Sequence, residues 1–131
     1  MGHGISIKCS NCQKKTKEFY LGVGWDYDSL ERVVSFLPPG KQPAVQEIIQ
    51  NHSVDNTEYS RKLFHCIYCN RLYDKLYMKI YYDGKEEYET EYFCKKCEAK
   101  LEKIDESRVT EIPCSNCDRK TLVVREDFLW D

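Results

Sequence analysis

The sequence contains no long hydrophobic stretch and no recognisable catalytic motif. It has no run of about 18 apolar residues, so it predicts no membrane-spanning helix and no membrane partner. Met1 to Ile5 lack the basic and apolar regions of a secretory signal peptide. No serine, histidine and acidic residue are spaced as in a known catalytic triad. Gly22 to Trp25 are glycine-rich, but no lysine and hydroxyl residue of a phosphate-binding loop follow them. An enzyme is therefore the least favoured class, and we expect no enzymatic activity.

The composition is that of a small globular chain with little apolar material for a core. The chain has 131 residues, of which 41% are hydrophobic and 32% are charged, and a formal net charge of −2. This length predicts a single compact domain over residues 1–131. A core this lean indicates that something besides apolar burial stabilises the fold.

All eight cysteines occur in pairs separated by two residues. The four pairs are Cys9/Cys12, Cys66/Cys69, Cys94/Cys97 and Cys114/Cys117. This spacing lets a tight turn, or knuckle, aim both sulfurs at one ion, and two knuckles complete the tetrahedron that zinc prefers. The eight residues therefore predict two all-cysteine Zn²⁺ sites with no cysteine left over. Closed sites of this kind stabilise folds and leave no open position for a substrate.

The three histidines are not needed as ligands. His65 stands beside Cys66, but eight cysteines already complete two sites. We expect His3 and His52 to be isolated and exposed to solvent.

Four disulfides in a secreted mini-protein are the alternative use of eight cysteines. Repeated Cys-x-x-Cys pairs and the missing signal peptide argue against it. We therefore expect a cytoplasmic protein in a reducing compartment. With each zinc and its four thiolates contributing −2, the loaded protein would carry a charge of about −6. That value counts against a broad surface that binds nucleic acid.

The two ends of the chain share the pattern Cys-Ser-Asn-Cys-x-x-Lys-Thr, at Cys9–Thr16 and Cys114–Thr121. Alternating apolar residues before and after each copy predict strands. These expected strands cover Ile5–Lys8, Lys17–Val23, Val109–Ile112 and Thr121–Val124. The repeat predicts an outer unit made of residues 5–24 with 109–131.

Residues 28–52 change from a two-residue to a 3.6-residue hydrophobic period. A first helix is expected after an N-cap at Asp28 or Ser29 and is stopped by Pro38-Pro39. A second is expected from Pro43 to about Asn51. We interpret these helices as packing elements inserted within the outer unit.

Residues 63–98 predict a central unit in which a long hairpin joins two cysteine pairs. Strand Leu72–Tyr82 leads to a turn at Asp83–Gly84, and strand Glu86–Phe93 returns to the next pair. Because a hairpin brings its ends together, this unit predicts that Cys69 and Cys94 lie close to each other.

The register of this hairpin depends on its loop. A loop of three residues, Tyr82–Gly84, places glycine in the left-handed position and sets Lys75 opposite Glu91 and Lys79 opposite Glu87. A two-residue loop would instead set apolar side chains opposite glutamates, so we favour the longer loop.

One face of the hairpin alternates tyrosine and lysine, which is a pattern found in platforms that stack nucleic-acid bases. The residues concerned are Tyr73, Lys75, Tyr77, Lys79 and Tyr81. The return strand places Glu87, Glu89 and Glu91 on the same face, and residues 73–93 hold three lysines against six acidic residues. We therefore interpret this face as solvated and crossed by ion pairs. If the two ends share a zinc, a basic group would cluster around it, comprising Lys8, Lys14, Lys15, Lys17, Arg119 and Lys120. We interpret this group as balancing the negative charge of the thiolates, with a nucleic-acid patch as the alternative.

The segment from Cys66 to Cys97 resembles the zinc-ribbon (rubredoxin-like knuckle) superfamily, and the terminal pairs supply a second ribbon-like site. The whole chain is similar to small bacterial zinc-ribbon proteins of unassigned activity. The resemblance implies zinc and no particular reaction. The glycine that often follows the second cysteine is missing, and Gln13, Asn70, Glu98 and Asp118 stand in its place.

The pairing of knuckles stays open between two schemes. In the nested scheme the two central pairs share one ion and the two terminal pairs share the other. In the sequential scheme the first pair joins the second and the third joins the fourth, which suits the short segment 98–113. We favour nesting, because it explains both the hairpin and the terminal repeat.

These observations predict a small α+β, metal-stabilised fold of two zinc-ribbon-like β units with a two-helix insertion. The favoured function is a non-enzymatic zinc-binding module that contacts a protein partner, as an adaptor does. The alternative is a zinc-ribbon protein associated with nucleic acid, in transcription or with RNA.

Overall fold

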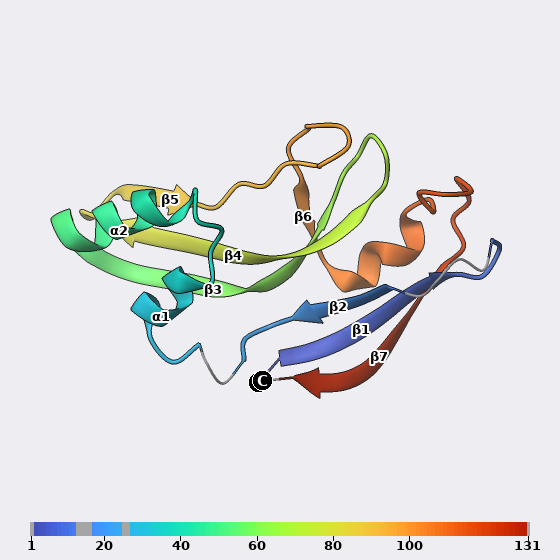
Figure 1. Ribbon diagram of the computed structural model, residues 1–131, viewed down its shortest axis with the longest axis horizontal. Coiled ribbons are helices and arrows are strands. Elements are labelled where there is room, and N and C mark those ends of the chain that lie inside the picture. Colours follow the sequence, from blue (N-terminus) through green and yellow to red (C-terminus); the bar gives the residue numbers. More distant parts are fainter. Residues whose placement is uncertain (1, 13–16, 25–26, 131) are drawn as a thin grey trace.

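The two ends of the chain pair with each other in one antiparallel sheet (Figure 1). The computed structural model describes residues 2–12, 17–24 and 27–130, and this sheet has the strand order β2-β1-β7. Strand β1 (Gly2–Cys9) lies between β2 (Lys17–Leu21) and β7 (Leu122–Trp130). Ile5 and Ile7, two residues apart, therefore share a face and pack on Phe19 and Leu21 in a buried core. β7 is longer than the expected Thr121–Val124.

A second antiparallel sheet carries the central cysteine pairs and has the order β5-β4-β3-β6. Its strands are β3 (Val54–His65), β4 (Leu72–Tyr82), β5 (Glu86–Glu89) and β6 (Glu102–Ile104). β4 has the bounds that the sequence predicted. The pattern did not reveal most of β3, because this strand is largely polar and only Leu63 and Phe64 within it are buried.

The predicted register between β4 and β5 is wrong by two residues. Lys79 lies opposite Glu89 and Tyr82 opposite Glu86, so the loop consists of residues 83–85. A shift of two preserves the faces, and Lys79 still reaches Glu87 with its Nζ 3.8 Å from the carboxylate. The return strand ends at Glu89 instead of Phe93. The Thr90 N–H still donates to the Met78 carbonyl, but the Met78 N–H donates to the Thr90 hydroxyl, and regular pairing goes no further.

The tyrosine and lysine face of β4 is less solvated than expected. Tyr77, at its centre, is only 6% exposed. Lys103 of β6 lies over its ring at 3.9 Å from the centroid, and its hydroxyl donates a hydrogen bond to Glu89. The segment that follows β5 therefore covers part of a face that the isolated hairpin would leave open.

Two short helices lie against the opposite face of β4 (Figure 1). Helix α1 (Leu30–Ser35) begins after Ser29, whose hydroxyl accepts a hydrogen bond from the Arg32 N–H, as the N-cap prediction required. Helix α2 (Gln42–Asn51) has proline in its first turn, also as predicted. Their buried side chains join those of β4 in one core, which comprises Val33, Val34, Leu37, Val45, Ile48, Leu76, Met78 and Ile80.

The expected strand Val109–Ile112 does not form. Residues 109–111 belong to a 3₁₀ helix, η1 (Glu106–Glu111), and Ile112 follows its end. Asp105 begins this helix by accepting a hydrogen bond from the Ser107 N–H. Val109 is buried in the core beneath the first sheet. β1 has neighbouring strands on both sides, so this segment has no place beside it in that sheet.

The two sheets meet where β2 lies beside β3. Gly22 and Arg61 exchange backbone hydrogen bonds of 2.9 and 2.7 Å. Asp74 of β4 accepts a hydrogen bond from the Tyr20 N–H and forms an ion pair with Arg61. Leu63 of β3 belongs to the core of the first sheet, so the two sheets share buried residues. Within the described ranges, no helix is both long and apolar enough to cross a membrane.

Candidate metal centres

The three cysteine knuckles that the structure describes in full have the same backbone geometry. The N–H of the first cysteine donates to the carbonyl five residues later, and its carbonyl accepts from the N–H four residues later. This pattern occurs at Cys66, Cys94 and Cys114, with distances of 2.8–3.0 Å. The first cysteine of every pair is buried and the second is partly exposed. Knuckles of this kind hold two sulfurs on one side of a rigid turn.

Each of these knuckles includes a residue with positive φ directly after its second cysteine. Asn70, Glu98 and Asp118 have φ values of 62°, 60° and 63°. Glycine is therefore not needed there, although a side chain in this region costs about 1 kcal/mol. Gln13, in the corresponding position of the first knuckle, lies outside the described residues.

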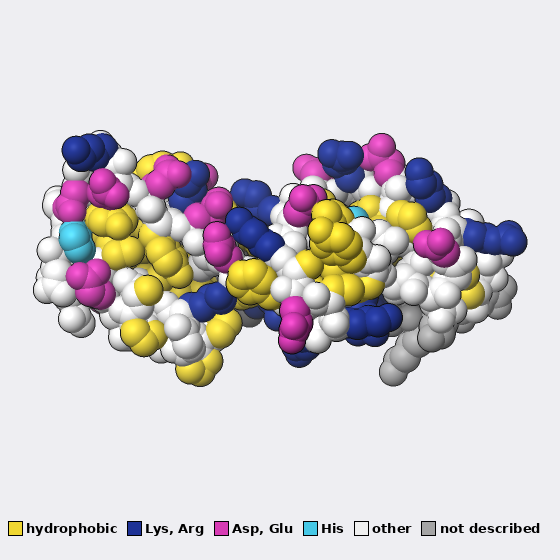
Figure 2. All heavy atoms as spheres, turned by 90° about the horizontal axis from the view of Figure 1, so that it is seen from above, with side chains coloured by type: hydrophobic (Ala, Val, Ile, Leu, Met, Phe, Trp, Pro, Cys, Tyr) yellow, Lys and Arg dark blue, Asp and Glu magenta, His cyan; other side chains and the backbone are white. Residues whose placement is uncertain are grey.

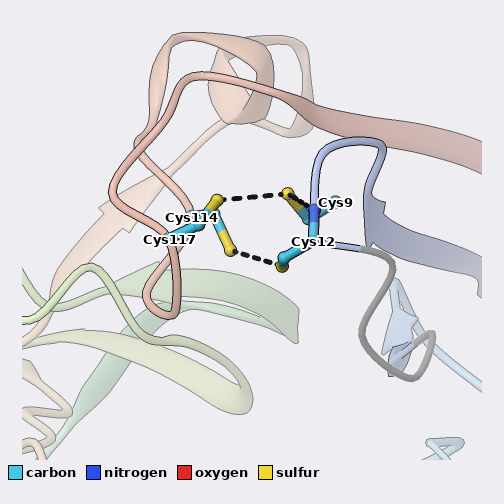
Figure 3. Close-up of side chains that lie close together, drawn as sticks. All are labelled: Cys9, Cys12, Cys114 and Cys117. Carbon is cyan, nitrogen blue, oxygen red and sulfur yellow. Dashed lines mark hydrogen bonds between the residues drawn. The ribbon is translucent and has the colours of Figure 1, made fainter.

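The two terminal knuckles converge into one group of four sulfurs, the outer tetrad, made of Cys9, Cys12, Cys114 and Cys117 (Figure 3). The sulfurs of Cys9 and Cys117 are 3.5 Å apart, and those of Cys12 and Cys114 are 3.8 Å apart. Pairing of β1 with β7 sets this geometry, because Cys9 lies opposite Leu122 at the end of both strands.

The two central knuckles form the inner tetrad, made of Cys66, Cys69, Cys94 and Cys97. Cys66 and Cys69 lie in the turn between β3 and β4, and the sulfurs of Cys69 and Cys94 are 3.6 Å apart. The first cysteine of each inner knuckle, Cys66 and Cys94, is buried in a third core with Phe64, Tyr77, Tyr92 and Leu101.

The grouping of cysteines is the nested one. A ladder of register pairs from Gly2 to Cys9 brings the termini together, so the outer tetrad is closed by the sheet that the two ends form. The sequential scheme would require Cys9 to approach Cys66, and the structure places these residues in different tetrads.

The donor sets fit a tetrahedral metal ion. All ligand atoms in each tetrad lie within 4.8 Å of one another. A zinc ion with four sulfur ligands at about 2.3 Å requires sulfur–sulfur separations of about 3.8 Å. The sulfur–sulfur separations given above are close to that value. Thiolates bind zinc well, whereas Mg²⁺ and Ca²⁺ prefer oxygen ligands. Both tetrads can therefore hold a metal ion.

Hydroxyl groups favour a thiolate at one position in each tetrad. The Thr121 hydroxyl lies 3.0 Å from the Cys9 sulfur and lowers the pKa of that thiol to about 6. The Tyr73 hydroxyl lies 3.4 Å from the Cys94 sulfur and likewise lowers its pKa to about 6. Burial instead raises the pKa of Cys69 and of Cys114.

Sequence reasoning did not find these two hydroxyl groups. The terminal repeat, which ends in threonine, could have indicated Thr121, because that residue bonds across to the other knuckle: its carbonyl accepts from the Ser10 N–H at 2.9 Å. Its counterpart Thr16 lies outside the described residues. Tyr73 had no such signal, since it looks like any tyrosine of a strand.

The histidines are not part of either tetrad. His65, beside Cys66, forms a hydrogen bond of 3.0 Å with Asn70 and stabilises the knuckle. His3 and His52 were expected to be isolated and exposed to solvent. His52 is exposed and His3 is partly exposed, but neither is isolated. His3 lies 3.2 Å from Glu106, and His52 lies between Glu47 and Asp83.

The surfaces above the two tetrads differ. The residues between the outer cysteines are Ser10, Asn11, Ser115 and Asn116, all polar and exposed. Above the inner tetrad, Ile67 is 49%, Tyr68 73% and Phe93 55% exposed. Figure 2 shows hydrophobic side chains exposed over these turns. Knuckle geometry does not require apolar tips, because the outer knuckle at Cys114 has the same backbone pattern without them.

The basic group predicted around the terminal repeats is only partly described. Lys8, Lys17, Arg119 and Lys120 are exposed near the outer tetrad, whereas Lys14 and Lys15 lie outside the described residues. Comparison with protein-family models, curated proteins and solved structures found no significant match to this chain.

Proposed function

We propose that this chain is a non-enzymatic, cytoplasmic zinc-binding protein whose two tetrads are structural four-cysteine sites. In this proposal it acts as an interaction module that contacts a protein partner. The two tetrads would hold zinc-ribbon-like units, 63–98 in the centre and 5–24 with 109–131 outside, with residues 28–52 as a helical insertion. All of these would form one domain over residues 1–131.

The chemistry of the donor sets supports the structural role. Four sulfurs occupy every position of a tetrahedron, so such a site leaves no coordination position for a substrate. Zinc bound there would cross-link the β1–β7 ends and the β3–β4 turn, which are the places where the apolar cores are smallest.

The single observation that supports an interaction role is the apolar surface over the inner tetrad. Exposed aromatic and aliphatic side chains beside one another are enriched at protein interfaces. Ile67 and Tyr68 form the exposed tip of one inner knuckle and exposed Phe93 precedes the other, whereas the tips of the outer knuckles are polar. Exposed lysines at 95 and 96 would form a polar rim.

A variant that exchanges the tips tests the proposal. Ile67→Ser with Tyr68→Asn gives the inner knuckle the tip of the outer ones, so zinc content and the circular dichroism spectrum should not change. Affinity capture from the native host should recover a defined protein with the wild-type chain and lose it with the variant. Equal recovery by both chains would contradict a role for this surface.

The alternative function, association with nucleic acid, has the exposed basic group near the outer tetrad in its favour. Genuine phosphate contacts would make binding fall steeply with salt. An electrophoretic shift over a salt series separates the two functions, because only the alternative predicts a shift that disappears as salt rises.

A further inference from the structure

Two lysines from separate segments meet at one aromatic ring near the inner tetrad, and a third directly follows one of the tetrad's cysteines. Lys41 precedes α2, Lys75 belongs to β4, and Lys95 follows Cys94. The Lys41 and Lys75 ammonium groups both lie over the Tyr92 ring, at 4.9 and 5.7 Å from its centroid. Lys75 is also 5.6 Å from the centre of the Tyr73 ring. Figure 2 shows Lys or Arg side chains in the middle of the face seen from above, with acidic side chains beside them.

Lys75 is surrounded by positive charge. Burial lowers the pKa of this half-buried ammonium group, and the charge of Lys95 lowers it further, with smaller contributions from Arg61 and Lys41. Only Asp74 acts in the opposite direction, and its carboxylate already binds Arg61 and the Tyr20 N–H. Directly across the strands, Lys75 faces Lys62, a like-charge pair that destabilises a sheet.

Glu91, which the predicted register placed opposite Lys75, does not form an ion pair with it. Because the register is shifted and β5 ends early, Glu91 does not lie opposite Lys75 but binds Lys100 at 3.2 Å. Among the residues that the structure describes, the ion pairs found include neither Lys41, Lys75 nor Lys95. On this face of β4, the acidic return strand thus provides a carboxylate partner for Lys79 but not for Lys75.

We propose that Lys41, Lys75 and Lys95 form a binding site for a phosphate-bearing ligand. A phosphate group carries up to two negative charges and several acceptor oxygens, so it can accept from ammonium groups that approach from different directions. Lysine binds phosphate as a point charge, which suits three flexible side chains held over aromatic rings. A bound phosphate would also remove the repulsion among the three cations. This site shares Lys95 with the rim of the apolar surface over the inner knuckles but includes none of its apolar residues.

Lys79 provides a matched control. It lies on the same face of the same strand, and its ammonium group is 5.2 Å from the centre of the Tyr81 ring. Unlike Lys75, it has a carboxylate partner in Glu87. Methionine at either position keeps the unbranched stem that packs on tyrosine and removes only the charge.

The test is calorimetric titration of the zinc-loaded full chain with tripolyphosphate at low ionic strength. Loss of one charged contact should weaken binding about tenfold in Lys75→Met, with similar losses in Lys41→Met and Lys95→Met. Lys79→Met should change the affinity less than about twofold. Absence of binding, or equal losses in Lys75→Met and Lys79→Met, would overturn the proposal.

A measurement on the wild-type chain guards against a variant that misfolds. Tripolyphosphate should protect Lys75 from reductive methylation while Lys79 remains reactive, as mass spectrometry can resolve. Equal protection of both lysines, or of neither, would also overturn the site.

A second titration distinguishes the sources of the phosphate. If the ligand is a single-stranded nucleic acid, a short oligothymidylate should bind more tightly than tripolyphosphate, and Lys75→Met should reduce its salt dependence. If the ligand is a small phosphorylated molecule, the oligonucleotide should bind no more tightly than tripolyphosphate. Oligonucleotide binding that is unaffected by Lys75→Met would place nucleic acid elsewhere and contradict its assignment to this site.

Discussion

At the scale of single residues, the knuckles depend on one backbone conformation that their sequence does not favour. Asn70, Glu98 and Asp118 all take the left-handed conformation after the second cysteine. Asparagine and aspartate tolerate it better than glutamate, whose longer side chain offers no local compensation. Glu98 is therefore the position at which the inner knuckle is most strained.

Replacing Glu98 with glycine should stabilise the protein. Glycine removes the steric cost of the positive φ, but it also raises the conformational entropy of the unfolded chain, which offsets part of the effect. The free energy of unfolding should therefore rise by about 0.5–1 kcal/mol. Urea unfolding of the zinc-loaded protein measures it. Asp118→Gly is the control and should give a smaller gain, because aspartate tolerates this conformation better than glutamate does. A loss of stability in Glu98→Gly would show that its side chain makes a contact of its own.

A second residue-scale feature connects the end of α2 to the turn after β4. His52 forms a hydrogen bond to Asp83, which raises the pKa of the histidine, and it also approaches Glu47. The Ser53 N–H donates to Asp83, and this bond, followed by that from His52, lowers the pKa of the aspartate. The charged pair is therefore favoured in the folded state.

This pair predicts how stability depends on pH. The contribution of His52 is complete below its unfolded pKa near 6.5 and is lost as pH rises through the higher folded value. The contribution of Asp83 is present above its unfolded pKa near 3.8 and is lost as pH falls through the lower folded value. The stability difference between wild type and His52→Gln should therefore be largest at mildly acidic pH and shrink above neutrality. A difference that grows with pH would contradict this assignment.

At the scale of elements, the two tetrads belong to different structural units. The outer tetrad closes β1 and β7, whereas the inner one closes the β3–β4 turn on the segment after β5. The buried clusters beside the two tetrads have no member in common, although β3 contributes Leu63 to one and Phe64 to the other. Loss of one metal site should therefore be partly local.

The double substitution Cys66→Ser with Cys69→Ser tests this independence. The zinc ratio should fall from near two to near one, and the amides of the β3–β4 turn should lose their protection from hydrogen exchange. The thiols of the outer tetrad should stay protected from alkylation. The mirror variant, Cys9→Ser with Cys12→Ser, serves as the control. Loss of both sites in either variant would show that the protein folds as one cooperative unit.

At the scale of the whole molecule, apolar burial is divided among three small cores. The largest contains eight buried residues, and the one at the inner tetrad includes two cysteines among its members. Cores of this size stabilise a chain only marginally. Structural zinc contributes about 10 kcal/mol per site to the folding of small domains, so metal should decide whether this one folds.

Removal of metal should therefore unfold most of the protein. Elemental analysis of the purified chain should give near two zinc ions and little iron, and a strong chelator should abolish the β-sheet circular dichroism signal. Restoring zinc should restore the spectrum. An unchanged spectrum in metal-free protein, a ratio of one zinc, or quantitative disulfides by mass spectrometry would each contradict this expectation.

The elements that the sequence alone determined are those whose signals are local. Four cysteine pairs, the N-cap at Ser29, the proline at the start of α2 and the bounds of β4 each depend on a few neighbouring residues, so they could be predicted. The nested grouping could be favoured because a hairpin and a repeat both indicated it, and the structure confirms it.

Tertiary structure alone decided the features that depend on distant partners. The strand β3 forms because β4 and β6 lie on either side of it, and its own polar residues gave no sign of this. Val109 lies in a 3₁₀ helix and is buried in the core of the first sheet, which the residues beside it did not indicate. The shifted register pairs Glu91 with Lys100 and leaves Lys75 among other cations. Pairing of this kind depends on which strands meet and where each one ends, and no short stretch of sequence contains that information.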